Sequence, residues 1–313
     1  MASALALGAG CLHPHAQSTR NGASLMLNFH VYDVFTDTPF TGNPLAIVEG
    51  ADGLTTAQMQ TIARQFNLSE TIFVQTPDDP AHTAKVRIFF PTAEIPFAGH
   101  PTIGCALHLA DGATQVTLEE VAGLVPVTIA NGLAEFTAPK LPRALPATPD
   151  RATLAAALGL ADSALADTPL GNFEGGPSFL YVELTSLDAL AQVRICEPAF
   201  TETRKTAGDT GAIYAYVHTG PNQIQGRMFD PPAGIAEDPA TGSATAILAA
   251  HLNAAGHLPH TGTTAFHLKQ GVEMGRPSAL RLTIDTEAGA LTAIRVAGQA
   301  VHIARGEIRV PAP

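Results

Sequence analysis

Two related blocks of sequence, one in each half of the 313-residue chain, constrain the fold more than any other feature. The first half contains Arg87-Ile-Phe-Phe-Pro91 and then Gly99-His-Pro-Thr-Ile-Gly-Cys-Ala106. The second half contains Arg227-Met-Phe-Asp-Pro231 and then Glu237-Asp-Pro-Ala-Thr-Gly-Ser-Ala244. Both follow R-[I/M]-F-x-P and [H/D]-P-x-x-G-x-A, at offsets of 140 and 138 residues. A repeated pattern indicates duplicated units, so we predict two copies of one domain that face each other. The alternative is coincidence in a sequence rich in Ala, Gly and Pro.

Composition is compatible with two domains and excludes several classes of protein. Hydrophobic residues make up 46% of the chain and charged residues 14%, so most of it can bury a core and is not disordered. A net charge of −11 without runs of Lys or Arg argues against a nucleic-acid partner. No apolar run is as long as a membrane-spanning helix, so no membrane partner is expected. The three cysteines lack CxxC spacing, which favours the reducing cytoplasm over a disulfide framework or a zinc ribbon.

Residues 1–25 are expected to form a disordered N-terminal extension. Residues 11–25 are rich in His, Ser, Asn and Gly, and a second methionine, Met26, stands directly before the first clear strand, Leu27 to Phe35. A start codon assigned too early would explain such an extension. A secretory signal is the alternative, although the basic segment with which such signals begin is missing.

The remaining sequence predicts an α+β fold with more strand than helix. A helix capped by Thr55 and ended by Asn67 is expected, because apolar residues recur at i, i+3, i+4 and i+7 from Met59. Strands or hairpins are expected at 71–75, 84–90, 115–138, 178–184 and 212–218. A proline-rich connection at 138–149 separates an N-terminal domain, 26–140, from a C-terminal domain, 150–305, whose final strands are free to return to the first domain.

Each repeat enters a helix that we expect to run through the centre of its domain. Residues Thr241 to Leu252 are small or apolar on almost every side, and Thr102 to Ala110 form a shorter equivalent. A helix without a polar face is a buried helix. Pro101 and Pro239 are predicted at the first helical position, where proline is well tolerated.

The starts of these two helices are the candidate functional region. Glycines in the first turns leave backbone N–H groups open to a carboxylate or phosphate, so a small anionic metabolite is the expected ligand. His100 and Asp238, directly before the two prolines, would converge on one cleft, an arrangement suited to proton transfer. Glu70 is a further acid/base candidate, because partly dry surroundings raise a carboxyl pKa. The alternatives are plain helix initiation, a structural histidine, an N-cap aspartate and a solvated glutamate.

Other functional motifs fail on their spacing. No glycine-rich dinucleotide motif follows a strand, and no Walker loop is present. Ser243 lacks the second glycine of a nucleophile elbow. The histidines of the C-terminal half are irregularly spaced and are joined by no carboxylate or cysteine, so we interpret them as helix-end and loop residues and expect no metal site. These histidines are His251, His257, His260 and His267.

Five segments, in order, resemble the phenazine-biosynthesis PhzF-like family, and the resemblance spans residues 27 to about 305. The segments are His30-Val-Tyr-Asp-Val-Phe35, Phe40-Thr-Gly-Asn-Pro44, Asn67-Leu-Ser-Glu-Thr71, Phe97-Ala-Gly-His-Pro101 and Glu237-Asp-Pro-Ala-Thr-Gly-Ser-Ala244. The resemblance implies a diaminopimelate-epimerase-like fold. In that fold two pseudo-symmetric domains each wrap a curved, mostly antiparallel sheet around a central helix, and the active site lies between them.

The resemblance also implies a function without metal or organic cofactor. In the phenazine enzyme of this family a glutamate moves a proton between carbons of a dihydro-hydroxyanthranilate. Carried over, Glu70 is the proton shuttle and His100 and Asp238 are its polar partners. The substrate cradle would be formed by Gly99, Gly242 and Ser243. A homodimer is expected as well.

Related epimerases of this fold use two cysteines, and neither helix start of this chain carries one, which disfavours a two-thiol racemase. Two alternatives stay open. One is an epimerase or racemase with His100 and Asp238 as its two bases, and the other is a non-catalytic metabolite-binding protein.

Overall fold

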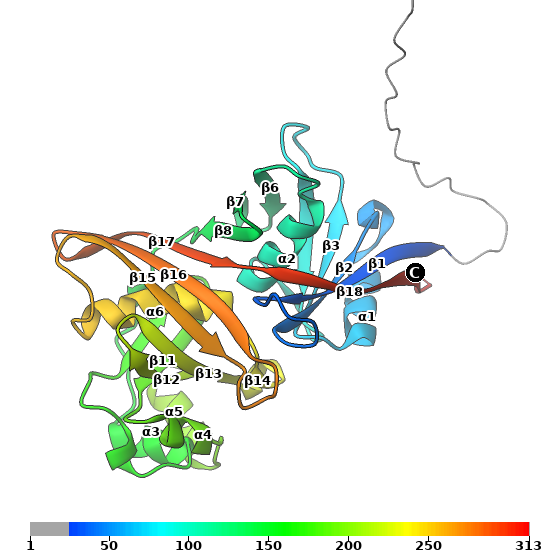
Figure 1. Cartoon of the computed structure of the whole chain (residues 1–313). Coiled ribbons are helices and arrows are strands. Elements are labelled where there is room, and N and C mark those ends of the chain that lie inside the picture. The colour runs from blue at the N-terminus through cyan, green and yellow to red at the C-terminus, as the bar shows by residue number, and fades with distance from the viewer. Residues whose placement is uncertain (1–24, 313) are drawn as a thin grey trace, which may run out of the picture.

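The computed structural model describes residues 25–312, which form two lobes of curved sheet, each closed around a central helix (Figure 1). The predicted α+β class, with two similar halves, is confirmed. The expected extension at 1–25 lies outside the described residues except for Leu25, and so does Cys11. None of the helices within 25–312 is long and apolar enough to cross a membrane.

The first lobe is built from β1 to β8, α1 and α2. Its elements are β1 (Met26–Val34), β2 (Asn43–Val48), the 3-10 helix η1 (Ala51–Gly53), α1 (Thr56–Phe66), β3 (Glu70–Gln75), β4 (Ala84–Phe89), β5 (Glu94–Ile95), α2 (Gly99–Leu109), β6 (Gln115–Glu120), β7 (Gly123–Ala130) and β8 (Leu133–Thr137). Helix α2 is the central one, and α1 packs on the outer face of β3 and β4.

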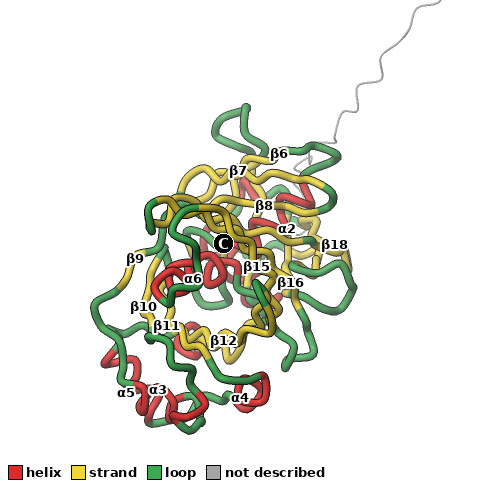
Figure 2. Tube along the Cα trace, turned by 60° about the vertical axis from the view of Figure 1, so that its left-hand side comes forward, coloured by secondary structure: helices red, strands yellow, loops and turns green. Residues whose placement is uncertain are grey.

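The second lobe and the C-terminal strands follow. Their elements are β9 (Arg143–Ala144), α3 (Arg151–Ala157), η2 (Asp162–Ala164), β10 (Gly171–Glu174), β11 (Ser178–Glu183), α4 (Leu187–Gln192), α5 (Ala199–Thr206), β12 (Ala212–Gly220), β13 (Gln223–Asp230), η3 (Pro231–Ala233), β14 (Ile235–Asp238), α6 (Gly242–Ala254), β15 (Gly262–Gln270), β16 (Ser278–Glu287), β17 (Ala290–Gly298) and β18 (Ala300–Arg309). Strands surround α6, whereas α3, α4 and α5 lie on the outside (Figure 2).

Strand pairing repeats from one lobe to the other. In the first lobe β1–β2 is antiparallel, β2–β3 parallel, β3–β4 antiparallel and β4–β6 parallel. In the second lobe β10–β11, β11–β12, β12–β13 and β13–β15 follow the same order of directions. The lobes are joined where β17 pairs with β8, and the last strand, β18, lies beside β1 in the first lobe. Both lobes therefore have one architecture, as duplication requires.

Helix α1 illustrates how local sequence defines an element. Thr55 accepts a hydrogen bond from the backbone of Gln58, whose side chain accepts one from the Thr55 backbone, so a capping box starts the helix. Asn67, in the left-handed conformation, ends it. Met59 and Ile62 are buried on its inner face. The prediction of this helix is confirmed at both ends.

The central helices are buried as predicted, but their predicted starts are wrong. Helix α2 begins at Gly99, so Pro101 is its third residue, and α6 begins at Gly242, so Pro239 precedes it by three residues. The backbone N–H groups of a first helical turn have no partner within the helix, so Pro101 is tolerated at the third position. A proline is also tolerated in the non-helical segment before a helix, where Pro239 lies. Asp238 is consequently not an N-cap; it is the last residue of β14, and Thr241 holds the N-cap position.

The first repeat block is structurally equivalent in the two lobes. Arg87 donates from Nε and Nη2 to Glu94 at 2.7 and 2.6 Å and lies over the ring of Phe89 at 5.3 Å. Arg227 makes the same bidentate pair with Glu237, both bonds 2.8 Å long, and lies 4.9 Å over a phenylalanine ring. The R-x-F part of the motif therefore encodes an ion pair stacked on an aromatic ring.

The second block does not align between the two lobes as predicted from the motif. Arg87 and Glu94 are seven residues apart, whereas Arg227 and Glu237 are ten apart, since η3 lengthens the second turn. The helix starts show that Gly242 corresponds to Gly99 rather than to the Gly104 of the aligned motif. His100 consequently corresponds to Ser243.

A buried glutamate next to α2 gives the first testable prediction. Burial raises the pKa of Glu120, the last residue of β6, to about 8. Thr102 Oγ1 lies 2.7 Å from Glu120 Oε1 and 2.7 Å from the Ala98 carbonyl oxygen. A hydroxyl has one hydrogen, so while Thr102 donates to Ala98, the Glu120 carboxyl has to be protonated in order to donate to Thr102.

We expect Glu120→Gln to stabilise the protein at pH 7 by about 3 kcal/mol and to have little effect at pH 4. The Glu120 carboxyl keeps its proton up to about pH 8 in the folded state but only to about pH 4.5 in the unfolded state. The wild-type free energy of unfolding therefore decreases as the pH rises from about 4.5 to about 8. The amide retains a donor for Thr102. Urea unfolding of both proteins at pH 4 and pH 7 is the measurement, and an equal difference between them at both pH values would contradict the assignment.

Candidate active site

A cavity of about 480 Å³ lies between the lobes and contains the predicted acidic residues on its wall. Its lining residues come from both halves of the chain, with Glu70 and Ala98 from the first half and Asp238, Thr241 and Ser243 from the second. A larger hollow of about 710 Å³, bordered by the loop at 36–41 and by β15 and β16, contains none of the predicted site residues. The smaller cavity is therefore the candidate active site.

Glu70 and His100 are in direct contact. Glu70 is the first residue of β3, directly after the turn that ends α1, and His100 is the second residue of α2. Glu70 Oε2 lies 2.9 Å from His100 Nδ1, with side chains 12% and 2% exposed. Within the described residues His100 Nε2 is buried without a hydrogen-bond partner. The Glu70 carboxyl group can accept and return a proton, and the His100 imidazole is its polar partner.

Asp238 is buried and held by hydrogen bonds from both lobes. Its Oδ1 accepts from Asn43 Nδ2 at 2.9 Å and from Ser69 Oγ at 3.0 Å, and its Oδ2 accepts from Thr241 Oγ1 at 2.5 Å. Burial and then the nearby Glu70 carboxylate raise the pKa of Asp238 to about 6. Asp238 and Glu70 therefore lie on the wall of the same cavity, and the Glu70 charge favours the protonated form of Asp238.

The starts of α2 and α6 touch at their first residues. A Cβ atom built on Gly242 would lie 3.1 Å from Gly99 Cα, and one built on Gly99 would lie 3.0 Å from Gly242 Cα. Backbone meets backbone at this contact, and no side chain fits between them. The two glycine backbones pack against each other and do not line the cavity. Their neighbours Ala98, Thr241 and Ser243 do line it.

The remaining wall is largely apolar, with one cation. Apolar side chains include Phe97, Phe179, Met228 and Ile235, and Lys140 is the only basic residue among the described residues that line the cavity. Lys140 is exposed and lies in the connection between the lobes. Such a wall suits a small organic anion, since apolar surface excludes water and the ammonium group attracts negative charge.

Sequence reasoning missed Asn43, Ser69 and Lys140 as site residues. Asn43 and Ser69 stand inside two of the segments used for the family resemblance, so their presence there was an available signal. Lys140 had no such signal, because it follows β8 in a linker and belongs to no motif.

Comparison with known proteins agrees with this fold. The family model of phenazine biosynthesis-like proteins matches residues 32–306. The chain belongs to that family. A trans-2,3-dihydro-3-hydroxyanthranilate isomerase of Pseudomonas fluorescens is 35% identical over 288 residues, covering 90% of this chain and 99% of the relative. An uncharacterized isomerase of Mesorhizobium japonicum is 38% identical over 300 residues, covering 90% and 98%.

A solved structure of a family member is similar along its whole length. The phenazine biosynthesis protein of the PhzF family from Bacillus anthracis superposes with a TM-score of 0.81 at 25% identity, covering 91% of this chain and 99% of that chain. The expected fold is therefore confirmed. Since the relatives are isomerases, the chain is an enzyme of the isomerase class.

The contact between the two helix starts gives the second prediction. We expect Gly242→Ala to destabilise the protein by about 1–3 kcal/mol, because the added methyl group would push against the Gly99 backbone. The matched control is Gly53→Ala, where an added Cβ meets nothing within 4 Å. Thermal unfolding of both variants measures the difference, and similar values for the two would show that the contact is not tight.

Proposed function

We propose that the protein is a cofactor-independent isomerase that moves a proton between carbons of a small carboxylate-bearing metabolite, with Glu70 as its acid/base. The observation that carries this proposal is the Glu70 carboxylate on the wall of a largely apolar cavity, 2.9 Å from His100 Nδ1. The relative from Pseudomonas fluorescens, an isomerase of a hydroxyanthranilate derivative, supports the reaction class.

In the proposed reaction Glu70 takes a proton from one carbon of the substrate. The electron pair of the broken C–H bond shifts a neighbouring double bond, and Glu70 returns the proton to the carbon at the far end of that shifted system. One C–H bond breaks and one forms, so the carboxylate is regenerated without an oxidant or reductant. His100 Nδ1, 2.9 Å from Glu70 Oε2, orients the Glu70 carboxylate for this transfer.

Asp238 assists from the second lobe. Three donors fix its position, and a pKa of about 6 allows its carboxyl to accept or donate a hydrogen bond to a polar group of the substrate near neutral pH. We assign the substrate carboxylate to the region of the helix starts beside Ser243, with Lys140 attracting it from the rim. A protein with a negative net charge can bind an anion in this way, because the electrostatic potential at the site, rather than the net charge, determines whether the anion binds.

The two-base epimerase is the second candidate and is less well supported. Two bases must approach one carbon from opposite faces, whereas Glu70 contacts His100 and its charge also raises the pKa of Asp238, so the three groups form one cluster. A non-catalytic binding protein is disfavoured because the relatives are isomerases.

The third prediction tests Glu70 directly. We expect Glu70→Gln to lower kcat by roughly 10²–10⁴-fold while the substrate still binds, since the amide keeps the shape of the side chain but cannot carry the proton. A suitable control is Glu202→Gln on the exposed outer helix α5. Proton NMR in deuterated buffer, first with trans-2,3-dihydro-3-hydroxyanthranilate and then with carboxylates found by thermal-shift screening, would follow deuterium incorporation.

Full deuterium exchange by Glu70→Gln would refute the role of Glu70. Inversion at a single carbon in place of a double-bond shift would identify the two-base epimerase instead.

The fourth prediction concerns the rim cation. We expect Lys140→Met to raise KM for a carboxylate substrate about tenfold, with kcat little changed, because the ammonium group acts on binding. The difference from the wild type should shrink at high ionic strength. Lys205→Met, on the outer helix α5, is the matched control. An unchanged KM at low salt would exclude Lys140 from anion binding.

A further inference from the structure

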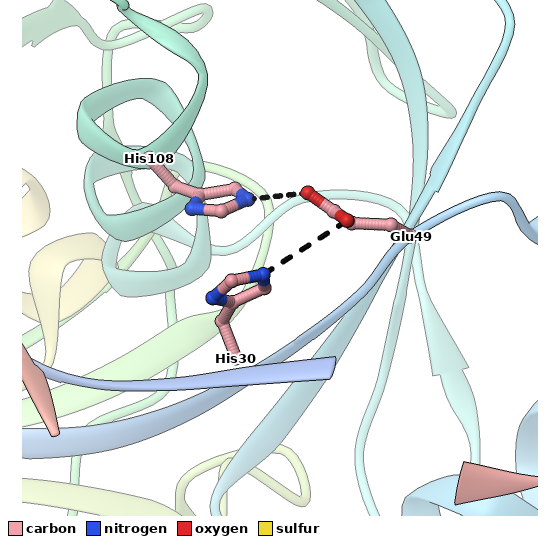
Figure 3. A group of neighbouring side chains, drawn as sticks. All are labelled: His30, Glu49 and His108. Carbon is pink, nitrogen blue, oxygen red and sulfur yellow. Dashed lines mark hydrogen bonds and ion pairs between the residues drawn. The ribbon is translucent and has the colours of Figure 1, made fainter. Parts of the chain in front are cut away.

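A second polar cluster lies at the opposite end of α2 from the cavity. His108 is in the last turn of α2, His30 is in β1, and Glu49 directly follows β2 (Figure 3). With a rise of 1.5 Å per residue, His108 lies about 12 Å along the helix from His100. The cluster is therefore separate from the proposed reaction.

The three side chains point toward one another. His108 Nε2 lies 2.8 Å from Glu49 Oε1, and His30 Nε2 lies 3.9 Å from Glu49 Oε2. One ligand atom from each residue falls within 4.8 Å of the others, and all three residues are partly buried. The arrangement presents two imidazole nitrogens and one carboxylate to a common point, as Figure 3 shows.

The ring nitrogens that face away from this point already have partners. His108 Nδ1 lies 3.1 Å from the Tyr32 hydroxyl oxygen, and His30 Nδ1 lies 3.2 Å from His302 Nε2. Without an ion, His108 Nε2 donates to Glu49. With an ion bound, the proton of each ring would sit on Nδ1 and be donated to its outer partner, which frees the Nε2 lone pair for the ion. Such outer partners fix the orientation of metal-binding histidines and raise their affinity.

We propose that His30, Glu49 and His108 form a site for a divalent transition-metal ion of the zinc type. Two histidines and one carboxylate are a zinc ligand set that leaves one position for water. Tetrahedral bonds of about 2.0–2.2 Å put ligand atoms roughly 3.4 Å apart, between the 2.8 and 3.9 Å of the two histidine–glutamate pairs. Shifts of about half an ångström would bring the two histidine–glutamate pairs to this separation, and the ligand atoms of the two histidines are already within 4.8 Å of each other.

The role of the ion would be structural. Its ligands come from β1, from the end of β2 and from α2, so one ion would fasten the central helix to the two strands beside it. Metal that binds only the folded state raises its stability by mass action.

A similar group in the second lobe is less well built. Glu183, His218 and His257 also lie within reach of one ion, but His257 is exposed. His257 Nε2 lies 3.3 Å from Glu183 Oε2, and His218 Nε2 is buried without a hydrogen-bond partner in the described part of the chain. This group therefore serves as the internal comparison for the test.

The experiment is Zn²⁺ binding to chelator-treated full-length protein by calorimetry and equilibrium dialysis. We expect a saturable site on each chain that disappears in His108→Phe and in Glu49→Gln, together with a Zn²⁺-dependent rise in Tm that both variants lose. Tyr32→Phe keeps all three ligands but removes the acceptor for His108, so the affinity should fall about 10–100-fold. Co²⁺ in place of Zn²⁺ should give the visible spectrum of a tetrahedral site.

Two control variants separate this site from other histidines. His257→Phe removes the second group, and the double variant His13→Gln with His15→Gln removes the histidines of the N-terminal segment. Both control variants should still bind zinc at the site that His108→Phe destroys. Circular dichroism establishes that each variant is folded. No bound zinc in the wild type, or zinc that survives in folded His108→Phe and Glu49→Gln, would overturn the proposal, as would zinc lost only in a control variant.

Discussion

The contact between Gly99 and Gly242 is the constraint on which the rest of the structure depends. Two buried helices meet there backbone to backbone, so their unpaired N–H groups are directed to one region and the residues beside them form the cavity wall. Helices that meet in this way must be covered on every other side by sheet, which requires the apolar helix surfaces seen in α2 and α6. The absence of Asp, Glu, Lys and Arg from both helices follows from this geometry.

Polar groups buried at the junction connect the lobes and have to be satisfied there. Asp238 of the second lobe receives donors from Asn43 and Ser69 of the first. In the same way, Arg276 of the second lobe donates to Asp33 and to the Gly42 carbonyl oxygen of the first lobe. An ion pair therefore also crosses this junction. Removing one partner would leave a buried group unpaired, which costs more than the bond contributes. These bonds therefore fix how the lobes meet as well as the site between them.

Features encoded by neighbouring residues could be predicted from the sequence, and features that depend on distant residues could not. The limits of α1 follow from Thr55 and Asn67, and the equivalence of Arg87 with Arg227 follows from a motif five residues long. The start of α6 did not follow, because a proline also fits the non-helical segment before a helix, where Pro239 lies. The partners of a buried carboxylate were also hidden, since Asn43 and Asp238 are 195 residues apart and only the folded chain brings them together.

Duplication made the scaffold symmetric, but the polar groups of the site are not. Strand and helix register place Ala212 where the other lobe has Glu70, Ser243 where it has His100, and Ile95 where the second lobe has Asp238. None of these three positions carries a titratable residue in both lobes, so the site has no symmetric pair of bases. One glutamate with supporting partners suits a reaction in which a single group removes a proton and returns it elsewhere. The asymmetry thus favours the proposed isomerase over the epimerase on grounds independent of the cavity.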